Sequence, residues 1–468
     1  MGQTSSLVDV CAWDEHNMHA SWVLLHITEN AIAFGVNSSI IVYMFYALYC
    51  NLCNRLGRPP VGNYVGGRWS ELSNDILRSL LERLSIVDFH RAKIVCRNWY
   101  ICSKQTSRRQ KRSPWLMLFQ ESSDCVLYNP DEDRVYKKRK RDFSRIRFLA
   151  NSGNWFLTLD SGSNLCIVDV FSDGRINLPP LHSVKGGHFT LKRIGDGEFI
   201  ERVASGDLGY SNMSVVDLRG LLWVDENKEE EYTVAWFFDT GSPYIAFCKK
   251  GEDHYRTIPT RIDVPREFRG LSDMVLRGDI LYVYTTRRFI RILDLSGQEG
   301  FKDVSNTNIL LPFYPASPPS DDETTYDGAI SSHNIAVTTS GEVLLVESIA
   351  YKATSEIPRI FRLYKTDPNP YPDELIHKPN LSVEVDSLGN EALLLDLGIT
   401  VPADPTLGIQ PNSIYFTRHH RLRNCKLKPS CPDICPCICV FNLDTKKLTQ
   451  FPSLSDLKPK DARWFLPS

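Results

Sequence analysis

From residue 113 to the end of the 468-residue chain, short apolar segments alternate with turn residues, and this pattern limits the fold more than any other feature. The segments are rich in β-branched and aromatic side chains, and Gly, Asp, Asn and Pro separate them. Typical units are "GNWFLTLDSGSNLCIVDVFSDGRINLPPL" and "GDILYVYTTRRFIRILDLSG". Similar units return at intervals of roughly 40 to 60 residues. The pattern predicts a large, mainly β domain.

Repeated sheets leave unpaired strand edges unless they stack or close into a ring. A β-propeller closes such a ring, so we expect a propeller over residues 113–468. A pair of β-sandwiches is the alternative. The repeat has no "WD" or double-glycine signature, so the sequence leaves the number of blades open.

A short helical passage precedes the β-rich region. Ser73 or Asn74 is placed to cap the first amide groups of its first helix. Apolar residues at three- and four-residue spacing predict one face of that helix: Leu72, Ile76, Leu77, Leu80, Leu81 and Leu84. A second apolar face follows at Phe89, Ala92, Val95, Cys96 and Trp99. A module of about 40 residues is only marginally stable by itself, so we expect it to pack against a partner or a neighbouring domain.

Two motifs make this passage resemble the F-box family. "LSNDIL", Leu72 to Leu77, is similar to its L-P-x-[DE]-[ILV] start, although Ser73 stands where the family usually has proline, and "VCRNW", Val95 to Trp99, matches its V-C-[RK]-x-W end. The alternative is a plain helical hairpin that caps a larger domain. The resemblance implies docking on a Skp-type adaptor and, through it, on a cullin scaffold. Trp99 is expected to be an internal packing anchor, and the implied adaptor-binding residues are Leu72, Ile76, Leu77 and Leu80.

The β-rich region is similar to the plant F-box family with a KIB-type β-propeller. The phrases that carry this resemblance include "PWLMLF", "NPDEDRVY", "FLANSGNWFLTLDSGSNL" and "EALLLDLGITVPADPTLGIQPNSIYFTR". The expected chain is therefore mainly β with a small α-helical module. An N-terminal extension covers residues 1–67, F-box helices cover 68–112, and a β-propeller-like, kelch-like domain covers 113–468.

The resemblance implies the substrate-recognition subunit of an SCF-type ubiquitin ligase, in which the F-box docks on the adaptor and the propeller recruits a target protein. The alternative is a propeller interaction module whose degenerate F-box no longer binds the adaptor, and Ser73 points to it. A propeller enzyme would need convergent carboxylates or a metal at the central channel. The chain has no G-x-S-x-G, H-E-x-x-H or P-loop motif, so we expect a non-catalytic receptor subunit without a cofactor.

Residues 31–53, "AIAFGVNSSIIVYMFYALYCNLC", are uncharged and long enough to span a membrane as a helix, so a membrane-tethered form is one alternative. The net charge of −2 gives no global preference for membranes or nucleic acid. Most of the 13 cysteines stand singly in apolar surroundings, which favours a reducing compartment. We expect the protein in the cytoplasm, the nucleus or both.

Two local clusters, one of basic residues and one of cysteines, could each have a specific function or none. The basic run Lys137, Lys138, Arg139, Lys140 and Arg141 is a nuclear-import candidate, and a solvated loop is the alternative. No aromatic residues are interleaved with it, so no nucleic-acid binding is expected. Cysteines 425, 431, 435, 437 and 439 lack the paired C-x2-C spacing of zinc sites, so no metal is expected.

Overall fold

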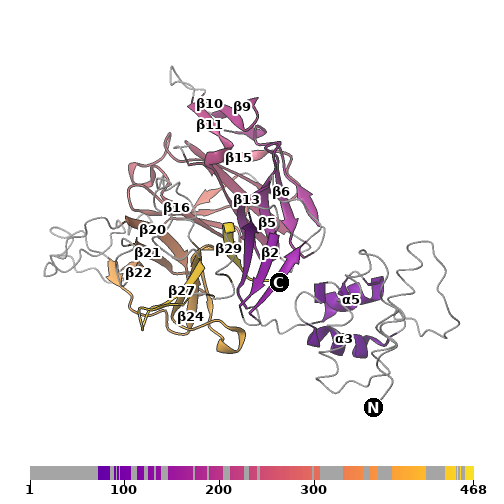
Figure 1. Cartoon of the computed structure of the whole chain (residues 1–468). Coiled ribbons are helices and arrows are strands. Elements are labelled where there is room, and N and C mark those ends of the chain that lie inside the picture. Colours follow the sequence, from indigo (N-terminus) through magenta and orange to yellow (C-terminus); the bar gives the residue numbers. More distant parts are fainter. Residues whose placement is uncertain are drawn as a thin grey trace, which may run out of the picture. The chain divides into compact units, whose positions relative to one another are not determined.

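The computed structural model of the chain divides into two compact units, Met1–Lys111 and Arg112–Ser468 (Figure 1). The first contains helices and the second is built of strands. The structure describes residues 72–84, 89–90, 92–93, 95–106, 113–120, 125–130, 133–138, 146–171, 174–186, 189–203, 211–225, 231–239, 243–297, 300–305, 330–350, 359–366, 382–417, 438–449, 451, 454 and 459–467.

Two helices of the first unit, α3 (Asn74–Arg83) and α5 (Arg97–Gln105), pack against each other. The Sγ atom of Cys102 donates a hydrogen bond to the carbonyl oxygen of Asn74 over 3.6 Å. The shared core consists of Leu77, Leu81, Phe89, Ala92, Trp99 and Cys102, all buried. The two predicted apolar faces therefore meet in one small core, and Trp99 is the expected packing anchor.

Within the described residues, the second unit contains six four-stranded blades. Blade 1 is β29 (Pro459–Phe465), β1 (Trp115–Gln120), β2 (Cys125–Asn129) and β3 (Arg134–Lys138), and blade 2 is β4 (Arg147–Ser152), β5 (Trp155–Leu159), β6 (Leu165–Asp169) and β7 (Arg175–Asn177). Blade 3 is β12 (Leu218–Asp225), β13 (Glu231–Phe238), β14 (Tyr244–Lys249) and β15 (Tyr255–Pro259), with β8 (Val184–Lys185) added at its outer edge. Blade 4 is β16 (Asp273–Arg277), β17 (Ile280–Tyr284), β18 (Ile290–Asp294) and β19 (Lys302–Asp303).

Blades 5 and 6 share one nine-stranded sheet, because Val337 of β20 pairs with Ile399 of β25. Blade 5 is β20 (Ile330–Val337), β21 (Val343–Ala350), β22 (Arg359–Thr366) and β23 (Ser382–Glu384). Blade 6 is β24 (Glu391–Leu394), β26 (Ser413–Thr417), β27 (Ile438–Asn442) and β28 (Leu448–Thr449), with β25 (Ile399–Pro402) on its inner side. One further sheet, β9 (Phe189–Gly195), β10 (Glu198–Val203) and β11 (Ser211–Ser214), lies between blades 2 and 3 in the chain.

The blades close into a ring through their inner strands. Contacts run from β4 to β12, β12 to β16, β16 to β20, β20 to β25 and β26 to β29. Blade 1 then meets blade 2 through the stacked rings of Phe119 and Phe148, whose centroids lie 3.9 Å apart, and through Phe156 and Phe465. The last strand, β29, pairs antiparallel with the first strand, β1. The fold is therefore a β-propeller, as predicted, and the alternative of two β-sandwiches is wrong.

Hydrogen bonds from side chains to the backbone join neighbouring inner strands. Nη1 and Nη2 of Arg147 in β4 donate to the carbonyl oxygens of Val215 and Leu218, and Oδ2 of Asp273 in β16 accepts from the backbone N–H of Ile335 over 2.8 Å. Apolar clusters fill five of the six seams among the described residues, and aromatic rings meet at the seam between blades 1 and 2, so neighbouring blades depend on each other for burial. The ring therefore offers a rigid frame for its surface turns.

The distribution of apolar and polar residues along the strands follows from this packing. Middle strands are covered on both faces and are continuous apolar runs, such as "CVLYN" and "YIAFC". The outermost strands β7 and β19 border solvent and are short and polar. Gly220 in β12 is required by close packing, because a Cβ atom there would lie 2.6 Å from Cδ2 of Leu157 in the next blade.

Candidate functional site

Three large apolar side chains of the helical unit remain exposed within its described residues. They are Ile76 on α3, 53% exposed, and Tyr100 and Ile101 on α5, 44% and 43% exposed. The neighbouring Leu77 has no exposed surface. Full burial of such a side chain is worth roughly 1.5–3 kcal/mol, and a partner that covered these half-exposed groups would gain part of that free energy. The unit thus presents apolar groups that its own fold does not bury.

The four residues implied as adaptor-binding have different places in the unit. Leu77 is a core residue, Leu72 is partly buried against the same core, and Leu80 is also partly buried. Ile76 alone among the four points substantially to solvent. Adaptor binding by these residues stays a prediction. Tyr100 and Ile101 were not singled out from the sequence, although their position directly after the "VCRNW" motif could have drawn attention to them.

The start of α3 differs from the expected cap. Ser73 occupies the N-cap position, but its side chain makes no capping hydrogen bond. Its backbone has φ −59° and ψ 143°, which is the conformation that proline adopts. The carbonyl oxygen of Ser73 still accepts the first helical hydrogen bond, from the N–H of Leu77 over 3.0 Å. The backbone geometry associated with the family proline is therefore present without the proline.

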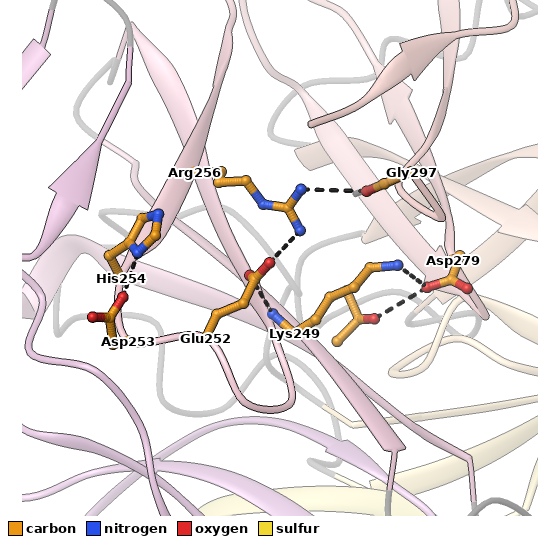
Figure 2. Close-up of polar contacts among 8 residues, drawn as sticks. Lys249, Glu252, Asp253, His254, Arg256, Asp279 and Gly297 are labelled. Carbon is orange, nitrogen blue, oxygen red and sulfur yellow. Dashed lines mark hydrogen bonds and ion pairs between the residues drawn. The ribbon is translucent and has the colours of Figure 1, made fainter. Parts of the chain in front are cut away.

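In the propeller, a group of charged side chains links the turns of blades 3 and 4 (Figure 2). The ammonium group of Lys249 in β14 lies 2.7 Å from Oδ1 of Asp279, in the turn between β16 and β17. Glu252 accepts from the backbone N–H of Lys249 over 2.9 Å, and its other oxygen pairs with Arg256. Arg256 also donates to the carbonyl oxygen of Gly297, 3.3 Å away. These bonds fasten the β14–β15 turn to the neighbouring blade.

The charges of this group pair with one another, Lys249 with Asp279 and Glu252 with Arg256. Beside it, the hydrogen bond from His254 and the charge of Lys185 hold the pKa of the Asp253 carboxyl below its ordinary value. No group of His, Cys, Asp and Glu that could hold a metal ion occurs within the part of the chain that the structure describes. The ion pairs therefore hold the turns of blades 3 and 4 in fixed positions relative to each other.

The basic run, the cysteine cluster and the apolar segment singled out from the sequence lie largely outside the described residues. Lys137 and Lys138 end strand β3, whereas residues 139–141 are outside the described residues. Cys439 is buried in β27, and residues 425–437 are outside the described residues. Residues 31–53 are outside them too. Among the helices that the structure describes, none is long and apolar enough to cross a membrane.

Comparison with known families agrees with both units. A family model of the F-box domain matches residues 69–111, and one of the KIB1-4 β-propeller matches residues 127–442. The chain belongs to the F-box proteins with a KIB1-4 β-propeller. The propeller match covers more than half of the chain and all strands of blades 2 to 5, whereas part of blade 1 and strand β28 of blade 6 lie outside it. F-box and β-propeller domains are typically interaction domains and typically non-catalytic.

Several F-box proteins of Arabidopsis thaliana are similar over almost their whole length. F-box protein At5g25290 is 56% identical over 404 residues, which cover 86% of this chain and 97% of that protein. F-box protein At2g14290 is 46% identical over 85% of this chain and 97% of its own length. F-box protein KIB4 is 36% identical over 84% of this chain and 94% of its own length. This F-box protein therefore shares both domains, in the same order, with its plant relatives.

Proposed function

We propose that this F-box protein is the substrate-recognition subunit of an SCF-type cullin ubiquitin ligase. The F-box module binds a Skp-type adaptor, and the propeller recruits a target protein for ubiquitin transfer by other subunits. The chain itself contributes no catalytic group. The observation that carries the proposal is the exposure of Ile76 next to the buried Leu77, in a module whose motifs and family match are those of an adaptor-binding domain.

Two features of the module support this role over a degenerate F-box. The φ angle of Ser73 keeps the backbone in the region of proline, so the entry to α3 retains the geometry of the family motif. Ile76, Tyr100 and Ile101 come from two helices that contact each other, so an apolar groove on one partner could cover them together.

The propeller supports the second half of the proposal. Its last strand closes the ring on its first strand, and ion pairs such as Lys249 with Asp279 fix turns on its rim. Binding residues are commonly placed on turns that a rigid frame holds in position. In this proposal the turns bind the target protein, and the propeller catalyses no reaction.

The experiment is a titration of the purified full-length chain with a purified Skp-type adaptor. Saturable binding at one adaptor per chain supports the proposal. A correctly folded chain that shows no binding would leave the alternative, a propeller interaction module whose F-box has lost its adaptor.

A further inference from the structure

Three arginines of the propeller are almost completely buried within the described residues: Arg219 at 9%, Arg291 at 6% and Arg359 at 8% exposure. Two of them have a carboxylate partner. Nη2 of Arg219 lies 3.5 Å from Asp239, and Nε of Arg291 lies 2.7 Å from Asp303. The third, Arg359, pairs with no carboxylate in the described part of the chain. Because a buried charge without a counter-charge is strongly unfavourable, this position calls for an anion.

The surroundings of Arg359 consist of hydroxyl groups and an aromatic ring. Nη1 donates to Oγ of Ser348 over 3.1 Å, and the guanidinium lies 5.4 Å from the centroid of Phe416. Nε of Arg359 is buried and has no hydrogen-bond partner. The ring of Phe416 also packs on Phe361, which is two residues from Arg359 in β22. The seam between blades 5 and 6 therefore holds the guanidinium in place while leaving a donor unused.

A second polar group, opposite Ser348 in the same sheet, also has no hydrogen-bond partner. Ser332 in β20 lies directly opposite Ser348 in β21, so both side chains project from the same face of the sheet. Oγ of Ser332 is buried and has no hydrogen-bond partner. Leaving a buried hydroxyl unpaired is costly, as is leaving a guanidinium nitrogen unpaired. The two orphaned groups lie at the same end of one sheet and are both potential donors to an oxyanion.

We propose that Arg359, Ser332 and Ser348 form an oxyanion-binding site that takes a phosphate group. Guanidinium and hydroxyl groups are the donors that bind phosphate oxygens, and the charge of the ligand would supply the missing partner of Arg359. A phosphate has three or more oxygens and can meet the guanidinium and both hydroxyls at once, whereas a carboxylate has only two oxygens. Arg359 is the first residue of β22, and 8% of its surface is exposed.

The phosphate could belong to a phosphorylated side chain of a bound protein or could be free in solution. In both cases the site binds the oxygens of a phosphate group. This inference concerns the propeller alone and does not rest on adaptor binding by the F-box module.

Calorimetric titration of the full-length chain tests the site with two probes. One is inorganic phosphate, with sodium chloride at equal ionic strength as the blank, and the other is a short peptide containing one phosphoserine, with its unphosphorylated form as the blank. The wild type is expected to bind phosphate saturably. Arg359→Met keeps the apolar stem over Phe416 but removes the charge, so its affinity should fall at least about tenfold. Arg287→Met, which changes an exposed arginine, should bind as the wild type does.

Ser332→Ala is the second variant, because it removes one donor with little change in packing. Its phosphate affinity should fall several-fold, about as expected for one hydrogen bond to a charged group. A phosphopeptide that binds more tightly than phosphate, and is displaced by it, assigns the site to a phosphorylated protein; phosphate binding without peptide binding assigns it to free phosphate. The proposal is overturned if the wild type binds neither probe, or if Arg359→Met and Ser332→Ala bind phosphate as tightly as the wild type.

Discussion

The side-chain amide of Asn151 donates a hydrogen bond to the backbone carbonyl of Trp464, across a separation of 313 residues in the chain and 3.2 Å in space. Asn151 belongs to the inner strand of blade 2 and Trp464 to β29, which completes blade 1 from the C-terminal end. Both residues are buried. This bond joins the last strand to the second blade and complements the pairing of β29 with β1.

Asn151→Ala should weaken the closed ring. The carbonyl oxygen of Trp464 would lose its buried donor, and such a loss costs about 1–3 kcal/mol. Thermal and urea unfolding of the full-length chain should both show the decrease in the free energy of unfolding. Asn177→Ala in the exposed outer strand β7 is the matched control and should change stability little. Equal stability of the two variants would show that this bond does not contribute to closure.

Asp396 should make the ring less stable as the pH rises. Burial raises the pKa of this carboxyl above its ordinary value of 3.8, although the charge of Arg463 and hydrogen bonds from Trp464 and Thr417 oppose the shift. The folded state therefore holds the proton more tightly than the unfolded chain. The resulting stability is present below pH 3.8 and is lost as the pH rises through the folded pKa.

The melting temperatures of the wild type and Asp396→Asn, measured side by side from about pH 4 to pH 7, isolate this effect because other titrating groups are common to both. The advantage of the wild type over the variant should shrink as the pH rises through the pKa of Asp396 in the folded protein. A difference that stays constant, or grows with pH, would contradict the raised pKa.

Ser73→Pro should stabilise the start of α3. The native φ of −59° already suits proline, so the substitution reduces the freedom of the unfolded chain by an amount worth about 0.4–1 kcal/mol. Amide hydrogen exchange in α3 should slow accordingly. Ser79→Pro lies inside the same helix and should instead cost about 3 kcal/mol, because proline there removes a helical hydrogen bond. Faster exchange in Ser73→Pro would be the opposite of the expected result.

Ile76 and Leu77 are neighbours in the chain, but Ile76 is half exposed and Leu77 is a core residue. Alanine substitutions at the two positions should therefore affect stability differently. Leu77→Ala empties a fully buried position and should destabilise the helical unit by about 2–5 kcal/mol. Ile76→Ala should change its stability by no more than about 0.5 kcal/mol, since half of that side chain is already in water. Amide hydrogen exchange in α3 and α5 reports the stability of the helical unit in both variants. Similar protection in the two variants would contradict the different roles of Ile76 and Leu77.

The sequence was enough to predict the order of the two domains and the class of each, because both depend on local patterns. Apolar residues at helical spacing and the "VCRNW" motif identified the helical module, and short apolar runs between turn residues identified the propeller. The number of blades could not be predicted. It depends on which distant strands pair, and the final strand β29 belongs to the first blade rather than to the strands just before it.

The candidate sites were harder to predict for a related reason. Spacing alone placed Ile76 and Leu77 on the same apolar face, yet Leu77 is buried in the core shared with α5, whereas Ile76 is outside that core and half exposed. The surroundings of Arg359 cannot be read from the sequence, because its contacts Ser348 and Phe416 come from two other strands and Ser332 lies opposite Ser348 on a third. Ladder register and blade packing, rather than residue type, create that environment.

The central claim is that the exposed apolar groups of the F-box module bind a Skp-type adaptor, and one comparison tests it most directly. The affinity of the purified adaptor is measured for the full-length wild type, Ile76→Asp and Ile194→Asp. The two isoleucines are equally exposed, at 53% and 54%, but Ile194 lies in β9 of the propeller unit. Burying an unpaired carboxylate at position 76 should weaken binding about a hundredfold or more, while Ile194→Asp binds as the wild type does. Unchanged affinity in Ile76→Asp, or no binding by the wild type, would contradict the account.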